Sequence, residues 1–355
     1  MTCSKTIILG LSKSGTTGHY QSLKTALKSS HKDIISLYEP RKRKVLDSAL
    51  KNSLHIPLLV KAMIQHLDLL NLDHENFTHR VAVVRDPRDL LVSLTVYRPL
   101  ISNNDISRLT PLLDLYEQKA SNPSAVSLRS INDMSDDLGL KNIPLDELVQ
   151  QYMELQRLSE RYRYFTSRYE DFVTGNLHGL MEYTGLSLTN TAVEEGWTGH
   201  VVRSKTSGHW RDWMTAEDVD FYRARIESII RAFGYDDEWD INSSPKIDRA
   251  KSIEYIRSGV QRVNNERLAL RKSNHGEYSA ESLKLLQDAA GDGSVKDILA
   301  LGRYYLRSAK SNEENAKLAV YWFELGALLG NKKAAKALMR LRSNFPEHEP
   351  EHLRV

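Results

Sequence analysis

The sequence predicts an α/β fold in which helices flank a central parallel sheet, followed by a small α-helical region. Up to about residue 100, short apolar and β-branched runs alternate with helical patterns, which is typical of such a sheet. After about residue 245, a charged segment leads into a stretch rich in alanine, leucine, glycine and tyrosine. We therefore expect one large α/β domain over residues 1–245 and a separate helical unit behind it.

The composition is that of an ordinary globular protein and argues against several function classes. Of 355 residues, 41% are hydrophobic and 27% are charged, and the net charge of +3 does not indicate nucleic-acid binding. No stretch approaches 18 apolar residues, so no membrane span is expected. The single cysteine, Cys3, excludes an internal disulfide and fits a reducing compartment. The start, MTCSKTIILGL, is interpreted as a first strand rather than a signal peptide, and we expect a cytoplasmic protein.

Four short runs in the first domain are expected to form strands. They are residues 6–9, 33–38, 79–84 and 164–169. After the first of these runs, Tyr20, Leu23 and Leu27 recur at the spacing of one helix face. Strands that alternate with helices in this way favour parallel pairing.

Two later segments of this domain have contrasting signals. Residues 216–233 are expected to form a helix, because Thr215 and Asp218 make a capping pattern in front of an apolar stripe. Residues 123–141 are rich in serine, asparagine, aspartate and glycine, and we expect a surface loop or lid there.

The C-terminal region contains an internal repeat. Residues 246–278 are expected to form a charged helical connector; beyond it, the segment starting at Gly293 is echoed by the one starting at Gly330, 37 residues later. The runs AAGDG, LGRYYL, AVYWFELGALLGN and AAKAL resemble Sel1-like repeats, a family known for protein–protein contacts. The resemblance implies a helical repeat and a protein partner at residues 279–345, the alternative being a cap that packs on the first domain. Residues 346–355 are expected to be a disordered tail.

The run IILGLSKSGTTGHY, residues 7–20, is typical of an anion-binding loop between a strand and a helix. Such loops expose backbone N–H groups, and the helix dipole adds partial positive charge. A Walker A loop needs G-x-x-x-x-G-K-[ST]. Gly10 and Gly15 have that spacing, but Thr16 stands at the lysine position and Lys13 precedes the second glycine. An ATP clamp with magnesium is therefore weakly supported, and a turn without a ligand is the simpler alternative.

Two further segments carry cations next to expected strand or helix ends. Arg85 follows an apolar strand, and with Ser93 in the next helix it could hold a phosphate. The alternative is that the arginines of this segment pair only with its two aspartates. Arg203 and Lys205 lie on a loop before Trp210, where a charged loop packed by the tryptophan is the alternative.

Together these segments resemble the sulfotransferases that use 3′-phosphoadenosine 5′-phosphosulfate (PAPS). The first resembles their 5′-phosphosulfate loop, and its residues are Ser12, Lys13, Ser14, Gly15, Thr16 and Thr17. Arg85 with Ser93 resembles their 3′-phosphate motif. Their C-terminal loop, R-K-G-x-x-G-x-W-K, resembles residues 203–211, with Arg203, Gly208 and Trp210 in place and Arg211 for the lysine; Lys205 of the same loop is a further candidate for donor binding. Tyr169, in the run Tyr-Glu-Asp, resembles a residue that lies near the adenine.

The resemblance implies a P-loop-like sulfotransferase fold, PAPS as sulfuryl donor, 3′-phosphoadenosine 5′-phosphate (PAP) as product, and no metal. Lys13 would meet the negative charge that develops on the bridging oxygen as the S–O bond breaks. The acceptor would be a hydroxyl or amine of a carbohydrate or small metabolite. Neither nucleic acid nor a membrane is expected among the partners.

The sequence also departs from the family. Its cytosolic members carry a catalytic histidine in the run Lys-Thr-His, but here Lys61-Ala-Met stands at the comparable place. Gly18 stands where those members have an aromatic residue that stacks on adenine. The usual general base is therefore missing from its usual position.

Other residues become candidates for that base. Glu39 is the first, because its run Leu-Tyr-Glu-Pro resembles a segment of carbohydrate sulfotransferases, which often use a glutamate. The alternative for Glu39 is a salt bridge to Arg41 or Lys42. His66 is the second candidate, and His55 lies nearby in the sequence.

Two other function classes stay open at this point. A P-loop nucleotide kinase or NTPase would need magnesium, a lysine where Thr16 stands and a carboxylate at a strand end, for which Asp86 is the candidate. A non-catalytic, sulfotransferase-like interaction protein would have lost its base and would recruit partners through residues 279–345.

Overall fold

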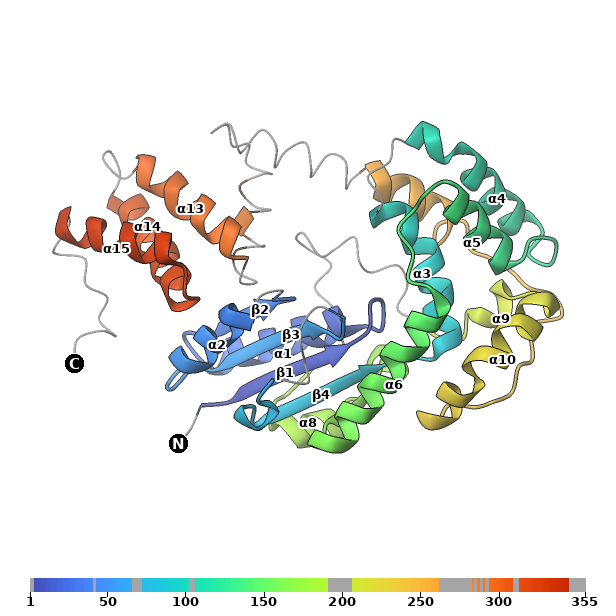
Figure 1. Ribbon diagram of the computed structural model, residues 1–355, viewed down its shortest axis with the longest axis horizontal. Coiled ribbons are helices and arrows are strands. Elements are labelled where there is room, and N and C mark those ends of the chain that lie inside the picture. Colours follow the sequence, from blue (N-terminus) through green and yellow to red (C-terminus); the bar gives the residue numbers. More distant parts are fainter. Residues whose placement is uncertain are drawn as a thin grey trace.

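The computed structural model describes residues 3–40, 43–65, 72–101, 106–190, 206–261, 294–308 and 313–344, with single positions between 283 and 290. Five described strands form one sheet in the order β2-β3-β1-β4-β5, and every neighbouring pair is parallel. Helices lie on both faces of this sheet (Figure 1). The expected α/β fold with a central parallel sheet and flanking helices is confirmed.

The strands are short, and all but the edge strand β5 are largely buried, as expected for a parallel sheet covered on both faces. Their bounds are β1 Lys5–Gly10, β2 Ile35–Tyr38, β3 Leu58–Met63, β4 His79–Val84 and β5 Phe165–Arg168. Four of them coincide with the expected strands to within two residues at each end. The strand β3, which lies between β2 and β1 in the sheet, was not expected; Lys61 interrupts its apolar run LLVKAM.

Ten helices belong to the described part of the first domain. They are α1 Thr16–Ser30, α2 Arg43–Asn52, α3 Pro87–Ile101, α4 Thr110–Ser121, α5 Leu128–Asp137, α6 Leu145–Tyr162, α7 Tyr169–Thr174, α8 His178–Thr184, α9 Trp210–Trp213 and α10 Ala216–Ala232. Two short 3₁₀ helices are His74–Asn76 and Ile106–Leu109. The helix at 216–233 is confirmed, and the Thr215–Asp218 capping box is present at its start.

The two faces of the sheet contribute to separate apolar cores, because successive strand residues point in opposite directions. Ile8 faces a core that includes Leu23 of α1 and Leu180 of α8. Its neighbours Ile7 and Leu9 face a larger core to which α2, α3, α4, α5, α6 and α10 contribute. This second core fixes α3 behind the carboxyl ends of the strands, where the candidate site lies.

The expectation of a loop or lid at residues 123–141 was wrong, because ten of these residues form α5. Leu128 and Ile131 are fully buried in the larger core. The carboxylate of Asp218, from α10, accepts hydrogen bonds from Leu128 N and Arg129 N at the start of α5. The polar composition of the segment reflects the exposed face of this helix. Its N-cap is Ser127, whose Oγ accepts from Ser130 N at 3.0 Å, and the distant Asp218 satisfies the two amides between them.

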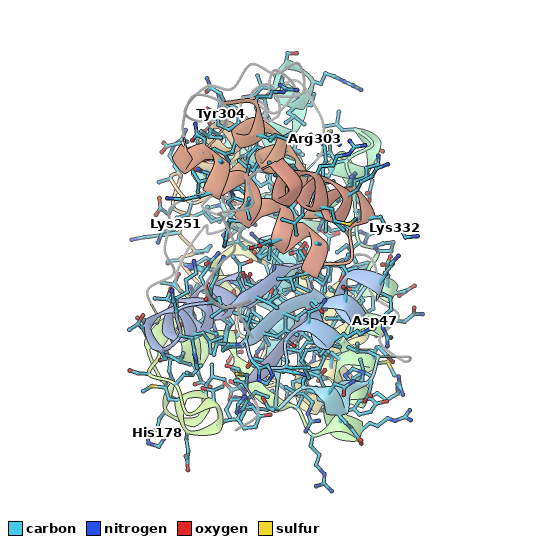
Figure 2. All side chains as sticks on the ribbon, turned by 90° about the vertical axis from the view of Figure 1, so that its left-hand side faces the viewer. Asp47, His178, Lys251, Arg303, Tyr304 and Lys332 are labelled. Atoms are coloured by element: carbon cyan, nitrogen blue, oxygen red, sulfur yellow. The ribbon has the colours of Figure 1, made fainter. Side chains whose placement is uncertain are left out.

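The C-terminal unit consists of α13 Val295–Ser308, α14 Glu313–Leu328 and α15 Lys332–Asn344. It packs against α2, where Ser48 Oγ and Asn52 Nδ2 donate to Leu328 O at 2.7 and 2.8 Å. Gly330 has a φ of +76°, and a Cβ there would lie 3.1 Å from Ser48 Oγ. Figure 2 shows the three helices on the side of the sheet where α2 lies, with Asp47 and Lys332 labelled.

Of the expected connector and tail, the structure describes residues 246–261. Of the connector at 246–278, residues 253–261 are helical, and Gly259 packs against Leu100 of α3. The expected tail at 346–355 lies outside the described residues. None of the described helices combines the length and apolar content needed to cross a bilayer.

Candidate anion-binding site

The loop between β1 and α1 is a tight turn that only glycine allows at two positions. Gly15, the N-cap of α1, has a φ of +96°, and a Cβ there would lie 2.4 Å from the ring of Tyr169. A Cβ on Gly10 would lie 2.5 Å from Cγ2 of Thr16. The buried Ser14 closes the turn, because its Oγ donates to Leu11 O at 2.9 Å. The backbone amides at this helix N-terminus therefore favour an anion.

Lys13 lies at the top of this turn with its side chain directed toward α3. Its φ of +67° is left-handed, which is uncommon for a residue with a Cβ. Its carbonyl oxygen accepts a hydrogen bond from Arg85 Nη1 at 3.2 Å. Its ammonium lies 4.1 Å from the centre of the Tyr97 ring. Because β1 and β4 are parallel neighbours, the Lys13 turn and the Arg85 strand end lie at the same edge of the sheet.

Arg85 is buried directly behind β4, with 4% of its surface exposed. Its guanidinium stacks over the ring of Tyr169 at 4.3 Å, and Tyr152 OH donates to its carbonyl at 2.7 Å. Arg85 Nε has no hydrogen-bond partner among the described residues, although it is buried. Buried polar groups are nearly always satisfied, so this N–H is available to an acceptor from outside the protein. Ser93, 3% exposed, lies two turns along α3.

Arg88, rather than Arg85, pairs with an aspartate in this segment. Its Nη2 lies 2.8 Å from Asp86 Oδ2, and it also donates to the carbonyls of Asp236 and Glu238. Asp86 accepts from Arg88 N at 2.9 Å and so caps α3. Burial raises the pKa of Asp86, while the hydrogen bonds from Arg88 oppose that shift. These contacts leave Arg85 without an ion pair in the described structure.

The segment around Trp210 docks on the first turn of α3. Asp89 accepts from Gly208 N at 2.6 Å and from Trp210 N at 3.0 Å. The buried ring of Trp210 lies 4.2 Å from the guanidinium of Arg88. Gly208 and Trp210 therefore lie next to the Arg85 strand end. Arg203 and Lys205 lie outside the described residues.

Glu170, next to Tyr169, ties the strand ends together. Its carboxylate accepts from Asp86 N and from Tyr235 OH, each at 3.0 Å. Burial raises the pKa of Glu170, and the hydrogen bond from Asp86 N opposes that shift. Tyr169 is thus held beneath Arg85 and against Gly15, so its ring supports the arginine and the loop at once.

Glu39 and Lys61 form an ion pair beside the loop. Lys61 Nζ lies 2.5 Å from Glu39 Oε1 and 3.9 Å from the centre of the Tyr38 ring, and Lys61 is 2% exposed. Burial alone would lower the pKa of Lys61, but Tyr38 and Glu39 outweigh burial and raise it. Tyr38 OH hydrogen-bonds Thr17 Oγ1 at 2.9 Å, which joins the pair to α1. The salt bridge of Glu39 is thus made by Lys61, a partner that the sequence did not predict.

Two of the three non-glycine residues with positive φ in the described chain, Lys13 and Glu39, belong to this site. The third, Arg163, is the C-cap of α6, where left-handed backbone is common. Such conformations cost about 1–3 kcal/mol and persist where the surroundings enforce them. Their concentration here supports a functional role for this edge of the sheet.

The histidines differ in their relation to the site. His66 lies outside the described residues, and the exposed His55 precedes β3, at the opposite edge of the sheet. His19, which the sequence did not single out, is buried in α1 and hydrogen-bonded to Gly15 O at 3.0 Å and Ser167 Oγ at 2.9 Å. Burial lowers the pKa of His19 to about 4, so this ring is neutral and holds the loop in place.

Comparisons with family models, curated proteins and solved structures gave no match to this chain. Among the described residues, no group of three or more histidine, cysteine, aspartate or glutamate side chains is arranged to hold a metal ion. What the site presents is a helix N-terminus, a lysine and a buried arginine at one edge of the sheet. These groups together are suited to binding anions.

Proposed function

We propose that the protein is a sulfotransferase that moves a sulfuryl group from PAPS to a hydroxyl or amine of an acceptor. The observation that carries this proposal is the contact between Arg85 and the Lys13 turn, together with the unsatisfied Arg85 Nε. PAPS has anionic groups on both the 5′ and the 3′ positions of one ribose. Two adjacent anion sites at one sheet edge match that pattern, and a nucleotide without a 3′-phosphate would use only one.

The donor groups are assigned to the chain as follows. The turn from Ser12 to Thr17 holds the 5′-phosphosulfate, and Arg85 with Ser93 holds the 3′-phosphate. Tyr169 supports Arg85, since one face of its ring already carries the guanidinium. The fold is accordingly proposed to be the P-loop-like sulfotransferase fold, and α13 to α15 to be a Sel1-like repeat.

Lys13 and Glu39 are assigned to the chemical step. The acceptor atom attacks sulfur, a new bond to sulfur forms, and the bond between sulfur and the bridging phosphate oxygen breaks. The electron pair leaves on that oxygen, where Lys13 stabilises the charge; one such oriented donor is worth about 3–4 kcal/mol. Glu39 takes the acceptor proton, and general-base assistance is typically worth roughly 10²–10⁴-fold in rate.

Lys61 gives the assignment of Glu39 a specific geometry. The ammonium engages Oε1 of the carboxylate, so Oε2 is the oxygen that we assign to the acceptor proton. Lys61 is therefore a positioning residue in this proposal. His66, the second candidate base, lies outside the described residues.

Calorimetric titration with PAP and with AMP, both in excess EDTA, tests the donor assignment. We expect PAP to bind tighter than AMP by roughly 30- to 160-fold, because charge-assisted hydrogen bonds to the 3′-phosphate contribute about 2–3 kcal/mol. Equal affinities would refute the assignment of Arg85 and Ser93. Binding that requires magnesium and prefers ATP would instead indicate a kinase or NTPase.

A mass-spectrometric screen with PAPS and a mixed panel of carbohydrates, phenols, alcohols and amines tests the transfer. The expected result is a sulfonate adduct on at least one acceptor class, lost in Lys13→Ala. Tight PAP binding without transfer to any member of the panel would favour the interaction protein.

A further inference from the structure

The ring of Tyr97 lies directly beneath the ammonium of Lys13, at 4.1 Å from Nζ to the ring centre. Tyr97 is half-buried on α3, one turn beyond Ser93, so it belongs to the same helix face as the proposed 3′-phosphate contact. A cation at this distance over an aromatic face is attracted by the ring quadrupole. The contact joins the β1–α1 turn to α3.

The backbone of Lys13 is held in a way that directs the side chain to this ring. Its left-handed conformation, with a φ of +67°, is one that the turn must enforce. Arg85 Nη1 holds its carbonyl oxygen, and the next residue closes the turn through Ser14 N to Leu11 O at 3.2 Å. With both sides of the residue fixed, the side chain leaves the turn toward α3 and meets Tyr97.

The surroundings of Tyr97 keep its ring neutral. Burial raises the pKa of Tyr97 well above its usual range, and the nearby Tyr255, Tyr38 and Glu39 add to that shift. The face of a neutral phenol attracts the ammonium and leaves its charge in place. A phenolate would instead form an ion pair with the ammonium and neutralise that charge. The same arrangement recurs beside it, where Lys61 lies 3.9 Å above the ring of Tyr38.

We propose that Tyr97 is a positioning residue that holds the Lys13 ammonium at the donor loop. The positive charge of Lys13 is then in place when negative charge develops on the leaving oxygen. This role rests on the proposed function, because it needs a leaving oxygen for Lys13 to meet. The aromatic face, rather than the phenol hydroxyl, does the positioning. Tyr97→Phe keeps that face, and Tyr97→Leu removes it.

The first test measures the contact without any nucleotide. Lysines of the full chain are reductively methylated with ¹³C, and the Lys13 signal is assigned by its loss in Lys13→Arg. We expect an upfield ring-current shift of that signal in the wild type and in Tyr97→Phe, and its loss in Tyr97→Leu. A shift that survives Tyr97→Leu would overturn the proposal. Should Tyr97→Leu not fold, Tyr97→Met takes its place as an unbranched filler of similar size.

The second test measures the consequence for bond breaking, with water as the acceptor. Wild type and variants are mixed with PAPS in single-turnover reactions, in which PAPS and water yield PAP, sulfate and a proton. We expect Tyr97→Leu to slow the formation of PAP from PAPS by about 2- to 30-fold, which corresponds to the strength of a cation–π contact. The affinity for PAP should change less than twofold. Tyr97→Phe is expected to recover most of the lost rate.

The outcomes separate the two proposals. Equal slowing in Tyr97→Phe and Tyr97→Leu, or a loss of PAP affinity that matches the loss of rate, would overturn the role of the Tyr97 ring. A wild type that neither binds PAP nor releases it from PAPS would refute the proposed function. In that case the methyl-lysine spectra would still decide whether Tyr97 holds Lys13.

Discussion

Replacing Arg85 with methionine is expected to remove the selectivity for a 3′-phosphate while leaving the fold intact. Methionine keeps the apolar stem of the arginine and ends near the position of Nε, so it removes the guanidinium that now lies 4.3 Å from the Tyr169 ring centre. The change removes one hydrogen bond, from Nη1 to Lys13 O at 3.2 Å, and one buried N–H without a partner. Losing that charge-assisted hydrogen bond and the contact with the Tyr169 ring lowers stability, and removing the unpaired buried N–H offsets part of the loss. The free energy of unfolding should therefore fall by about 1–3 kcal/mol.

The effect on binding should be much larger. A guanidinium–phosphate contact contributes about 2–3 kcal/mol when it is buried, which corresponds to a 30- to 160-fold change in Kd. We expect Arg85→Met to weaken PAP by that factor and to change AMP less than threefold. Calorimetric titration of both nucleotides in EDTA measures the two values, and urea unfolding measures the stability.

Arg80 offers a matched control on the same strand. It also has a buried Nε without a partner among the described residues, and its Nη1 donates to His74 O at 3.3 Å. It lies near the amino end of β4, the opposite edge of the sheet from Arg85. Arg80→Met should leave the ratio of PAP to AMP affinity unchanged. If Arg85→Met weakened AMP as much as PAP, or if Arg80→Met changed the ratio equally, the reasoning would be refuted.

Four further expectations concern the loop, the ion pair and the C-terminal helices. Gly15→Ala should destabilise the protein by more than about 2 kcal/mol and abolish PAP binding, because the added Cβ would lie 2.4 Å from a carbon of the Tyr169 ring. Gly139→Ala is the control, since Gly139 has a similar φ of +67° but open space around it. It should lower the free energy of unfolding in urea by only about 1 kcal/mol. Glu39→Gln should lower the free energy of unfolding by about 2–3 kcal/mol, because it leaves the Lys61 ammonium buried without its carboxylate. The double variant with Lys61→Met should recover most of that loss. If the effects of the two substitutions on stability were simply additive, the ion pair would be contradicted. Because the pKa of Lys61 is raised above its ordinary 10.5, the pair stabilises the fold fully below that pH, and unfolding titrations should show the contribution lost as pH rises through the higher folded value. Gly330→Ala should loosen the C-terminal helices from α2, seen as faster hydrogen exchange in both, and unchanged exchange in α2 would show that the contact is not needed.

Much of the α/β domain could be predicted because its strands are local signals. A short β-branched run followed by a helical period suffices to place β1, β2, β4 and β5. The strand β3 was missed because Lys61 looks incompatible with a buried strand when its partner is unknown. That partner is Glu39, which follows β2, and in the sheet Tyr38 pairs with Lys61. Strand order, which no single segment carries, decides this contact.

Segment 123–141 is a second case in which a contact with a distant part of the chain, rather than the local sequence, explains the structure. Its serines and aspartates favour a loop by composition, yet α5 forms there. The first amides of α5 are satisfied by Asp218, about 90 residues later in the chain, and its apolar side is buried in the larger core. Local propensity was overridden by a tertiary contact.

The sequence by itself determined the α/β class, the glycine turn after β1 and the placement of Arg85 behind an apolar strand, because each depends on neighbours within a few residues. Only the tertiary structure decided that Arg85 holds Lys13 O, that Tyr97 lies beneath the Lys13 ammonium and that Lys61 pairs with Glu39. Parallel strands bring distant loops to one edge in an order set by sheet packing and not by chain position. The charges that meet there are therefore known only once the sheet is assembled.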